Sequence, residues 1–283
     1  MKSFLLVFFP IILGHAQTLP PEHLASHVAA ANRVTGSTPK DVVSNGIQSR
    51  VFPRIMAGND WETDIVLLNP GSAAVTFQQL FFGVDGRMVP YAIHDRNGFE
   101  NQATSGIRGV LAPNSSMSLA LSAVSATVCE GWSLITYDAG PGAVDGYAIL
   151  RRKGPGGAFS FEITVPLSSM QDYSKYMPFD NTQGFRSQLT LLNPAGNIAS
   201  QVQLTYLSPQ GTVVFLDSVV IAPGQQMTLT LPDTYPDLAN KTGTVIVEAN
   251  TDRFVVQGMR YNEAYGAVAS LPAMNGGSLP SPR

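Results

Sequence analysis

The chain has 283 residues, a formal net charge of −3 at pH 7 and only 13% charged residues. It carries no basic stripe, so neither nucleic acid nor an anionic membrane surface is an expected partner. Its single cysteine, Cys129, excludes an intramolecular disulfide, so the fold has to rest on its own apolar cores. The length gives room for two domains of ordinary size.

Residues 1–16 have the pattern of a secretory signal peptide. Lys2 gives a positive start, an apolar run follows from Phe4 to Leu13, and small residues around Ala16 end the segment. The apolar run is too short to cross a bilayer as a helix. We therefore expect cleavage near Ala16 and a protein that is secreted, periplasmic or held at the cell surface.

Residues 17–50 are expected to be an N-terminal extension and linker. Prolines followed by an Ala-rich stretch predict a short helix over residues 21–34. His23 and His27 would share one face of that helix, but the pattern lacks a third metal ligand. The sequence favours a solvent-exposed helix face there over a metal site.

An internal repeat is the strongest signal in the chain. The motif Leu-Leu-Asn-Pro at residues 67–70 recurs at 191–194, and Leu-Ala-Pro at 111–113 recurs as Ile-Ala-Pro at 221–223. Further landmarks follow in the same order along the chain. The repeat predicts two related copies of one β-rich unit.

Each copy has the pattern of short strands joined by turns. Residues 61–68 alternate between two faces, and dipeptides such as Asp85-Gly86 mark turns. The sequence therefore predicts an all-β protein with two tandem immunoglobulin-like β-sandwich domains, each of seven or eight strands. Copy one is expected at 51–168 and copy two at 175–274, with a disordered tail at 275–283.

Candidate catalytic residues are few. His94 is the one histidine within the two copies, and it lies in the segment 93–107 that copy two lacks. No Gly-x-Ser-x-Gly motif accompanies it, so a solvated loop histidine is favoured over a catalytic base. Asp95 begins a polar loop whose oxygen ligands are too few for a calcium site. Cys129 has no neighbouring base and is expected to be a small buried hydrophobe.

Aromatic residues are the main candidates for ligand contact. Trp61 is matched by Phe185 in copy two, which is typical of a core position. Trp132 is matched by Thr244 and is therefore the better candidate for a surface contact, with Tyr137 as a possible companion. A structural role for tryptophan remains the commoner outcome in such folds.

The stretch from Phe52 to Met88, the Leu-Ala-Pro at 111–113 and the Arg-Tyr-Asn at 260–262 resemble parts of uncharacterised secreted bacterial proteins with tandem immunoglobulin-like β-sandwich repeats. The resemblance implies fold and export, and it supplies no catalytic residues.

The functional prediction is an exported, non-catalytic binding or structural/adhesion module. Its ligand would be a polysaccharide or another protein, with no cofactor and no metal. One alternative is a secreted hydrolase with its site in the segment 93–107, because binding residues concentrate on loops. The other is an assembly subunit that pairs through sheet edges.

Overall fold

The computed structural model describes most of the chain beyond the N-terminal segment. The described residues are 46–95, 102–125, 127–154, 157, 159–170, 173–194, 197–251 and 253–275. The expected signal peptide, the helix over 21–34 and the tail beyond residue 275 lie outside these ranges. Those three predictions therefore stay predictions.

Almost all of the described structure is β, and its strands form four antiparallel sheets. Sheet I has the spatial order β11 (Ser168–Ser169), β1 (Ile47–Ala57), β8 (Cys129–Asp138), β3 (Val75–Gly83) and β6 (Gly106–Leu111). Sheet II has the order β10 (Phe159–Pro166), β9 (Asp145–Lys153), β2 (Trp61–Asn69), β7 (Ser115–Ala123), β4 (Tyr91–Asp95) and β5 (Gln102–Thr104). We call strands β1–β11 the first half.

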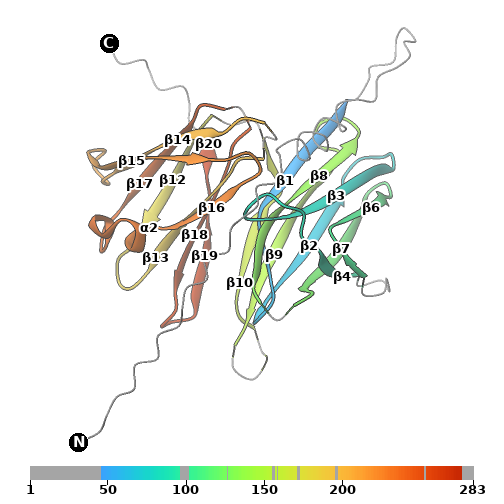
Figure 1. The fold of residues 1–283 in the computed structure, drawn as a ribbon, viewed down its shortest axis with the longest axis horizontal. Helices are drawn as coiled ribbons and strands as arrows, with labels where there is room; N and C mark the ends of the chain where they lie inside the picture. Colours follow the sequence, from blue (N-terminus) through green and yellow to red (C-terminus); the bar gives the residue numbers. More distant parts are fainter. Residues whose placement is uncertain are drawn as a thin grey trace, which may run out of the picture.

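Strands β12–β20 make up the second half, which lies beside the first (Figure 1). Sheet III has the order β15 (Val213–Ile221), β14 (Ser200–Leu207), β17 (Thr242–Ala249), β12 (Ser174–Asp180) and β20 (Met274–Asn275). Sheet IV has the order β16 (Gln226–Thr230), β13 (Arg186–Leu192), β18 (Val255–Asn262) and β19 (Ala267–Leu271). A short helix α2 (Leu231–Thr234) and a 3-10 turn η1 (Pro236–Leu238) follow β16.

The predicted architecture of two tandem immunoglobulin-like sandwiches is wrong. The four small antiparallel sheets are arranged like the four blades of a β-propeller. In an immunoglobulin-like sandwich the first strand lies beside the second. Here β1 pairs with β8 and β12 pairs with β17, while β2 and β13 belong to other sheets. Sequence alternation identifies a strand but does not identify its partner.

The sheets pack face to face around separate apolar cores. Sheets I and II enclose most of one core, which contains Phe52, Phe77, Ile65 and Leu121 and also reaches Met259 of sheet IV. Sheets III and IV enclose another. A third cluster joins the halves, because residues of sheet I contact residues of sheet IV. Its buried members are Val51, Phe82, Trp132, Leu134, Leu192 and Val255.

Sheet I is therefore covered on both faces, and the burial of its residues reflects this. In β8 the five consecutive residues 131–135 are all buried, where a strand with one wet face would alternate. Gly131 is required within this run, because a Cβ there would lie 1.9 Å from the carbonyl oxygen of Phe82. Gly243 of β17 is in the same situation, with a Cβ that would lie 1.9 Å from the Leu207 carbonyl oxygen.

The two Leu-Leu-Asn-Pro motifs have the same structural task. Asn69 Nδ2 donates to the carbonyl oxygens of Ala73 (2.8 Å) and Leu111 (3.0 Å). Asn193 Nδ2 donates to those of Ile198 (2.8 Å) and Ile221 (3.0 Å). Both asparagines are buried, so these bonds satisfy polar groups that water cannot reach. The recurrence of the motif is therefore explained by these hydrogen bonds, which close the strand ends in both halves.

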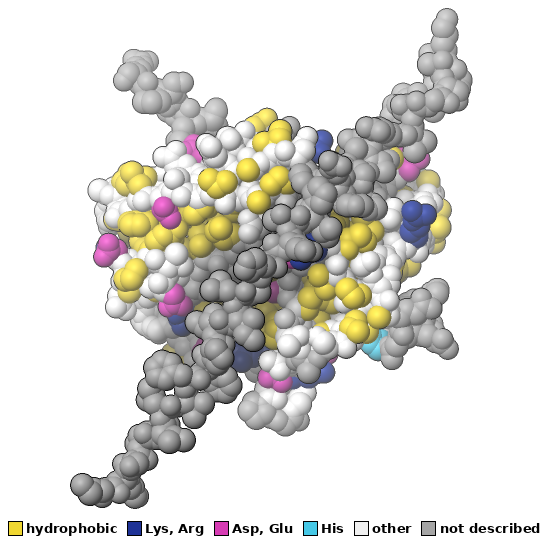
Figure 2. Space-filling view, in the orientation of Figure 1, with side chains coloured by type: hydrophobic (Ala, Val, Ile, Leu, Met, Phe, Trp, Pro, Cys, Tyr) yellow, Lys and Arg dark blue, Asp and Glu magenta, His cyan; other side chains and the backbone are white. Residues whose placement is uncertain are grey.

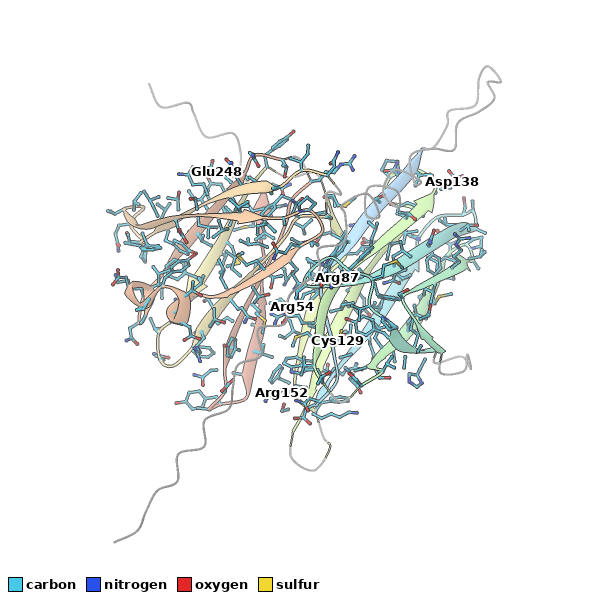
Figure 3. All side chains as sticks on the ribbon, viewed as in Figure 1. Arg54, Arg87, Cys129, Asp138, Arg152 and Glu248 are labelled. Atoms are coloured by element: carbon cyan, nitrogen blue, oxygen red, sulfur yellow. The ribbon has the colours of Figure 1, made fainter. Side chains whose placement is uncertain are left out.

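A buried guanidinium crosses the junction between the halves. Arg54 of β1 is 6% exposed and lies between the halves (Figure 3). Its Nε is 3.0 Å from Glu130 Oε1, and its Nη1 donates to Gln188 Oε1 and contacts Met259 Sδ at 2.8 Å. Thr228 Oγ1 also donates to Glu130 Oε1, at 3.2 Å. Burial lowers the pKa of Arg54, and the Glu130 carboxylate opposes that shift.

Removing the Glu130 carboxylate leaves this buried charge without its counterion. We expect Glu130→Ala to lower the free energy of unfolding by about 2 kcal/mol, below the full cost for a buried pair because Glu130 is partly exposed. Urea unfolding measures the change, and Glu263→Ala, at an exposed turn, is the control. Arg54→Met in the Glu130→Ala background should recover stability. A Glu130→Ala protein as stable as the control would contradict the assignment.

Candidate functional site

The two aromatic residues proposed for ligand contact are buried. Trp132 is 0% exposed; its ring stacks on Phe82 with 4.3 Å between centroids, and its Nε1 donates to the Gly224 carbonyl oxygen at 2.9 Å. Tyr137 is 3% exposed and packs in the core of sheets I and II. Neither offers a surface to a soluble ligand, so their interpretation as surface contacts is wrong.

Trp132 and Thr244 occupy equivalent positions in the two halves, and the difference in residue type follows from what packs against each position. Trp132 lies opposite Phe82 in sheet I, and Thr244 lies opposite Leu207 at the corresponding register of sheet III. The Trp132 face of sheet I is covered by the second half. The difference between the copies therefore marks an internal junction and not a ligand site.

His94 and Asp95 lie at the end of β4, which pairs with β5 and with β7. The segment 93–107, expected to be a loop, thus contributes a hairpin to the edge of sheet II, with residues 96–101 outside the described part. His94 Nε2 lies 3.1 Å from Ser122 Oγ on β7. Asp95 is in register with Leu119, and its side chain lies outside the described structure.

Sequence reasoning missed the contact between His94 and Ser122. The two residues are 28 positions apart, and no motif surrounds Ser122. Only the pairing of β4 with β7 brings them together. The alternation of Leu119 and Leu121 with small residues was the available sequence signal. It places Ser122 on the outward face of sheet II, where the structure finds it.

Cys129 packs against the core of the first half. Its Sγ lies 3.3 Å from the Tyr91 hydroxyl. Burial, and next the contact with Cys129, raise the pKa of that tyrosine above its ordinary value. Within the described ranges, no group of three His, Cys, Asp or Glu side chains is placed to hold a metal ion.

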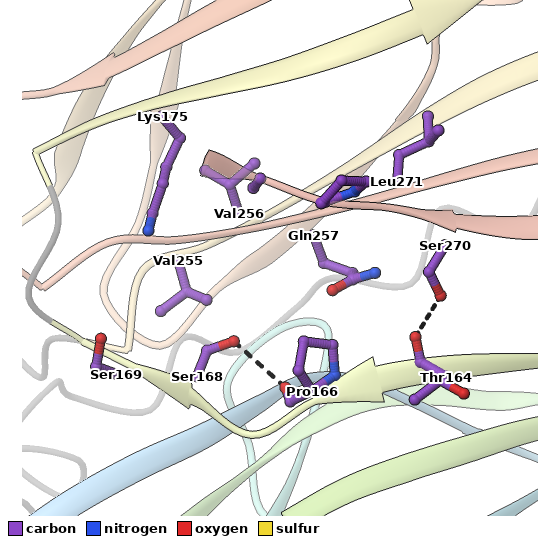
Figure 4. Close-up of a pocket in the computed structure, with 12 residues that line it drawn as sticks. Thr164, Pro166, Ser168, Ser169, Lys175, Val255, Val256, Gln257, Ser270 and Leu271 are labelled. Carbon is purple, nitrogen blue, oxygen red and sulfur yellow. Dashed lines mark hydrogen bonds between the residues drawn. The ribbon is translucent and has the colours of Figure 1, made fainter. Parts of the chain in front are cut away.

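A groove of about 470 Å³ lies where the two halves meet (Figure 4). The first half contributes residues from β10 and the segment after it, and the second half contributes residues from β12, β18 and the segment around β19. The lining residues are Thr164, Pro166, Ser168, Ser169, Lys175, Val255, Val256, Gln257, Ser270, Leu271, Pro272 and Ala273.

The groove has a buried floor and a polar rim. Val255, Val256 and Gln257 are buried, whereas Thr164, Ser169 and Ser270 are exposed. Ser270 Oγ donates to the Thr164 carbonyl oxygen and so bridges the halves, and Gln257 Nε2 donates to the Gly258 carbonyl oxygen at 2.8 Å. Lys175 Nζ donates to Asn275 Oδ1. These lining residues supply hydroxyl, amide and ammonium groups for hydrogen bonding.

Comparison with known proteins finds no matching family model, no matching curated protein and no matching solved structure. The resemblance to secreted bacterial proteins therefore stays a prediction. No helix in the described part of the chain is long and apolar enough to cross a membrane.

The burial of Trp132 can be checked by fluorescence. In a Trp61→Phe protein, Trp132 is the one remaining tryptophan, and we expect blue-shifted emission that iodide quenches poorly, because the indole has no contact with water. N-acetyl-tryptophanamide under the same conditions is the reference. Quenching of Trp132 as strong as that of the reference would contradict the buried position.

Proposed function

We propose that this protein is an exported, non-catalytic binding module, and that the groove between its halves holds a polysaccharide chain. Export rests on the signal-peptide pattern of residues 1–16. The observation that carries the binding proposal is the groove itself, with hydroxyl and amide groups around an apolar floor. Ligand sites commonly combine such a floor with a few placed polar groups.

The rim chemistry favours a hydroxyl-rich ligand. Ser168 and Ser270 donate their hydroxyl protons to the carbonyl oxygens of Pro166 and Thr164, so their oxygens are left to accept hydrogen bonds from sugar hydroxyls. The exposed Ser169 carries a hydroxyl that can both donate and accept. Tyr147 lies opposite Pro166 in the pairing of β9 with β10 and is 37% exposed. It is one strand away from the lining residue Pro166, and we expect its exposed ring to stack on a sugar that extends past the groove.

A glycan array probed with the full chain tests this proposal. We expect at least one neutral or weakly acidic polysaccharide to be retained. Ser169→Trp places a large side chain in the groove at an exposed position and should weaken that binding by about tenfold or more, as expected for the loss of about 1.4 kcal/mol. Gln210→Trp, at an exposed turn that does not line the groove, is the control.

Two results would refute the groove as the site. One is retention of no glycan, and the other is unchanged affinity in the Ser169→Trp protein. Retention of a protein ligand that Ser169→Trp abolishes would keep the groove as the site but replace the ligand class.

The contact between His94 and Ser122 favours a second candidate, a secreted hydrolase with its site beside the segment 93–107. His94 Nε2 lies at hydrogen-bond distance from Ser122 Oγ, so it can take the hydroxyl proton as Oγ attacks an ester carbonyl. The resulting acyl-serine would be hydrolysed by water after His94 returns the proton to the departing alcohol.

Turnover of a panel of activated esters tests the hydrolase. The expected pattern is loss of turnover in both Ser122→Ala and His94→Ala, with activity retained in Ser118→Ala, a serine on the same strand face. Turnover that survives Ser122→Ala, or no turnover in the unaltered protein, excludes this candidate.

A further inference from the structure

Strand β15 is a long, uncovered sheet edge. It lies at the end of sheet III, and among the described residues it pairs on one side only, with β14. Three of its apolar side chains are well exposed: Val213 at 51%, Leu216 at 57% and Val220 at 61%. Figure 2 shows hydrophobic side chains at the surface of both halves with few charged groups among them. An apolar edge of nine residues presents backbone donors and acceptors to any other strand.

The corresponding edge of the first half is protected. Strand β6 occupies the end of sheet I as β15 occupies the end of sheet III. Arg108 lies there in register with Gln78, and it is exposed. At the matching register of sheet III, Ser218 lies opposite Gln203. A charged side chain on an edge discourages pairing with another chain, so the second half lacks a safeguard that the first half has.

The one charged residue of β15 is turned away from this exposed row. Asp217 lies opposite the buried Leu204. Its Oδ2 accepts a hydrogen bond from the Tyr235 hydroxyl at 2.6 Å, and its Oδ1 accepts one from the Ser218 backbone N–H at 2.7 Å. The exposed row that Leu216, Ser218 and Val220 form on β15 therefore carries no charge of its own.

We propose that a second copy of this chain pairs with this edge, β15 against β15, in antiparallel orientation about a two-fold axis at Ser218. This register places Leu216 of each copy opposite Val220 of the other, and Ser218 opposite itself. Cross-strand apolar pairs are the stabilising unit of a sheet, and two-fold symmetry forms the Leu216 and Val220 pair twice. The two copies of sheet III become one continuous sheet of ten strands, twice the five that one copy has.

Self-complementarity is the reason to choose a second copy over an unrelated strand. The row is apolar, uncharged and symmetric about Ser218, so an identical strand meets it without placing like charges face to face. A register centred on Asp217 would instead bring two carboxylates opposite one another. Edge pairing alone buries less surface than a standard interface, so we expect a reversible dimer whose population depends on concentration.

Sedimentation velocity across a dilution series tests the proposal with the full chain. We expect a monomer–dimer equilibrium in the unaltered protein. The Leu216→Lys and Val220→Lys double variant should raise the dissociation constant at least about tenfold, the effect of about 1.4 kcal/mol. Val110→Lys, on the exposed edge strand β6 where Val110 is 57% exposed, is the matched control and should leave the equilibrium unchanged.

A cysteine crosslink tests the register separately. In a Cys129→Ala background, Ser218→Cys should form an intermolecular disulfide on oxidation, because the two-fold axis brings the two residues within bridging distance. Gln203→Cys, an exposed position one strand inward, should form far less. A protein that stays monomeric at the highest concentration, or a dimer that both lysines leave intact, overturns the proposal. Neither result bears on glycan binding in the groove, so the two proposals fail independently.

Discussion

The packing of sheet IV against sheet I is the contact on which the rest of the structure depends. It covers the second face of sheet I, so β8 has to be apolar on both sides, and every polar group placed there needs a partner. Arg54 meets that condition through Glu130 and Gln188, and Trp132 meets it through the Gly224 carbonyl oxygen. The junction thus combines apolar contact with directional bonds, which fix one relative placement of the halves.

The candidate binding groove follows from that placement. Its walls come from β10 of the first half and from β18 and β19 of the second, so the groove exists only while the junction holds. The bond from Ser270 to the Thr164 carbonyl oxygen joins the two walls directly. The shape of the groove therefore depends on the stability of the junction. We expect a substitution of Arg54 to weaken ligand binding in the groove, although Arg54 does not line it.

Local structure could be predicted from the sequence, and long-range arrangement could not. The alternation of residues 61–68 identified β2, which spans Trp61–Asn69, because a strand's two faces are a property of neighbouring residues. The partner of β1 is set by residues about 80 positions away, and no local pattern encodes it. For the same reason Trp132 looked like a surface residue, and the approach of His94 to Ser122 was invisible until β4 was paired with β7.

The differences between the halves are best understood through what covers each sheet. The same strand order occurs in sheets I and III, yet sheet I has a neighbour on its outer face where sheet III has Thr244 in place of Trp132. At the sheet edges the second half is the one that differs in being open to a partner. Strand β6 carries Arg108, whereas β15 carries Ser218 at the same register. The charge of Arg108 disfavours pairing of another strand with β6. The equivalent strand β15 has no such charge on its exposed row, so pairing is disfavoured at one edge and not at the other. That contrast within a single molecule is stronger evidence for a specific contact at β15 than the exposure of Leu216 and Val220 alone, because both strands occupy the same end position of equivalent sheets and β15 is the longer of the two.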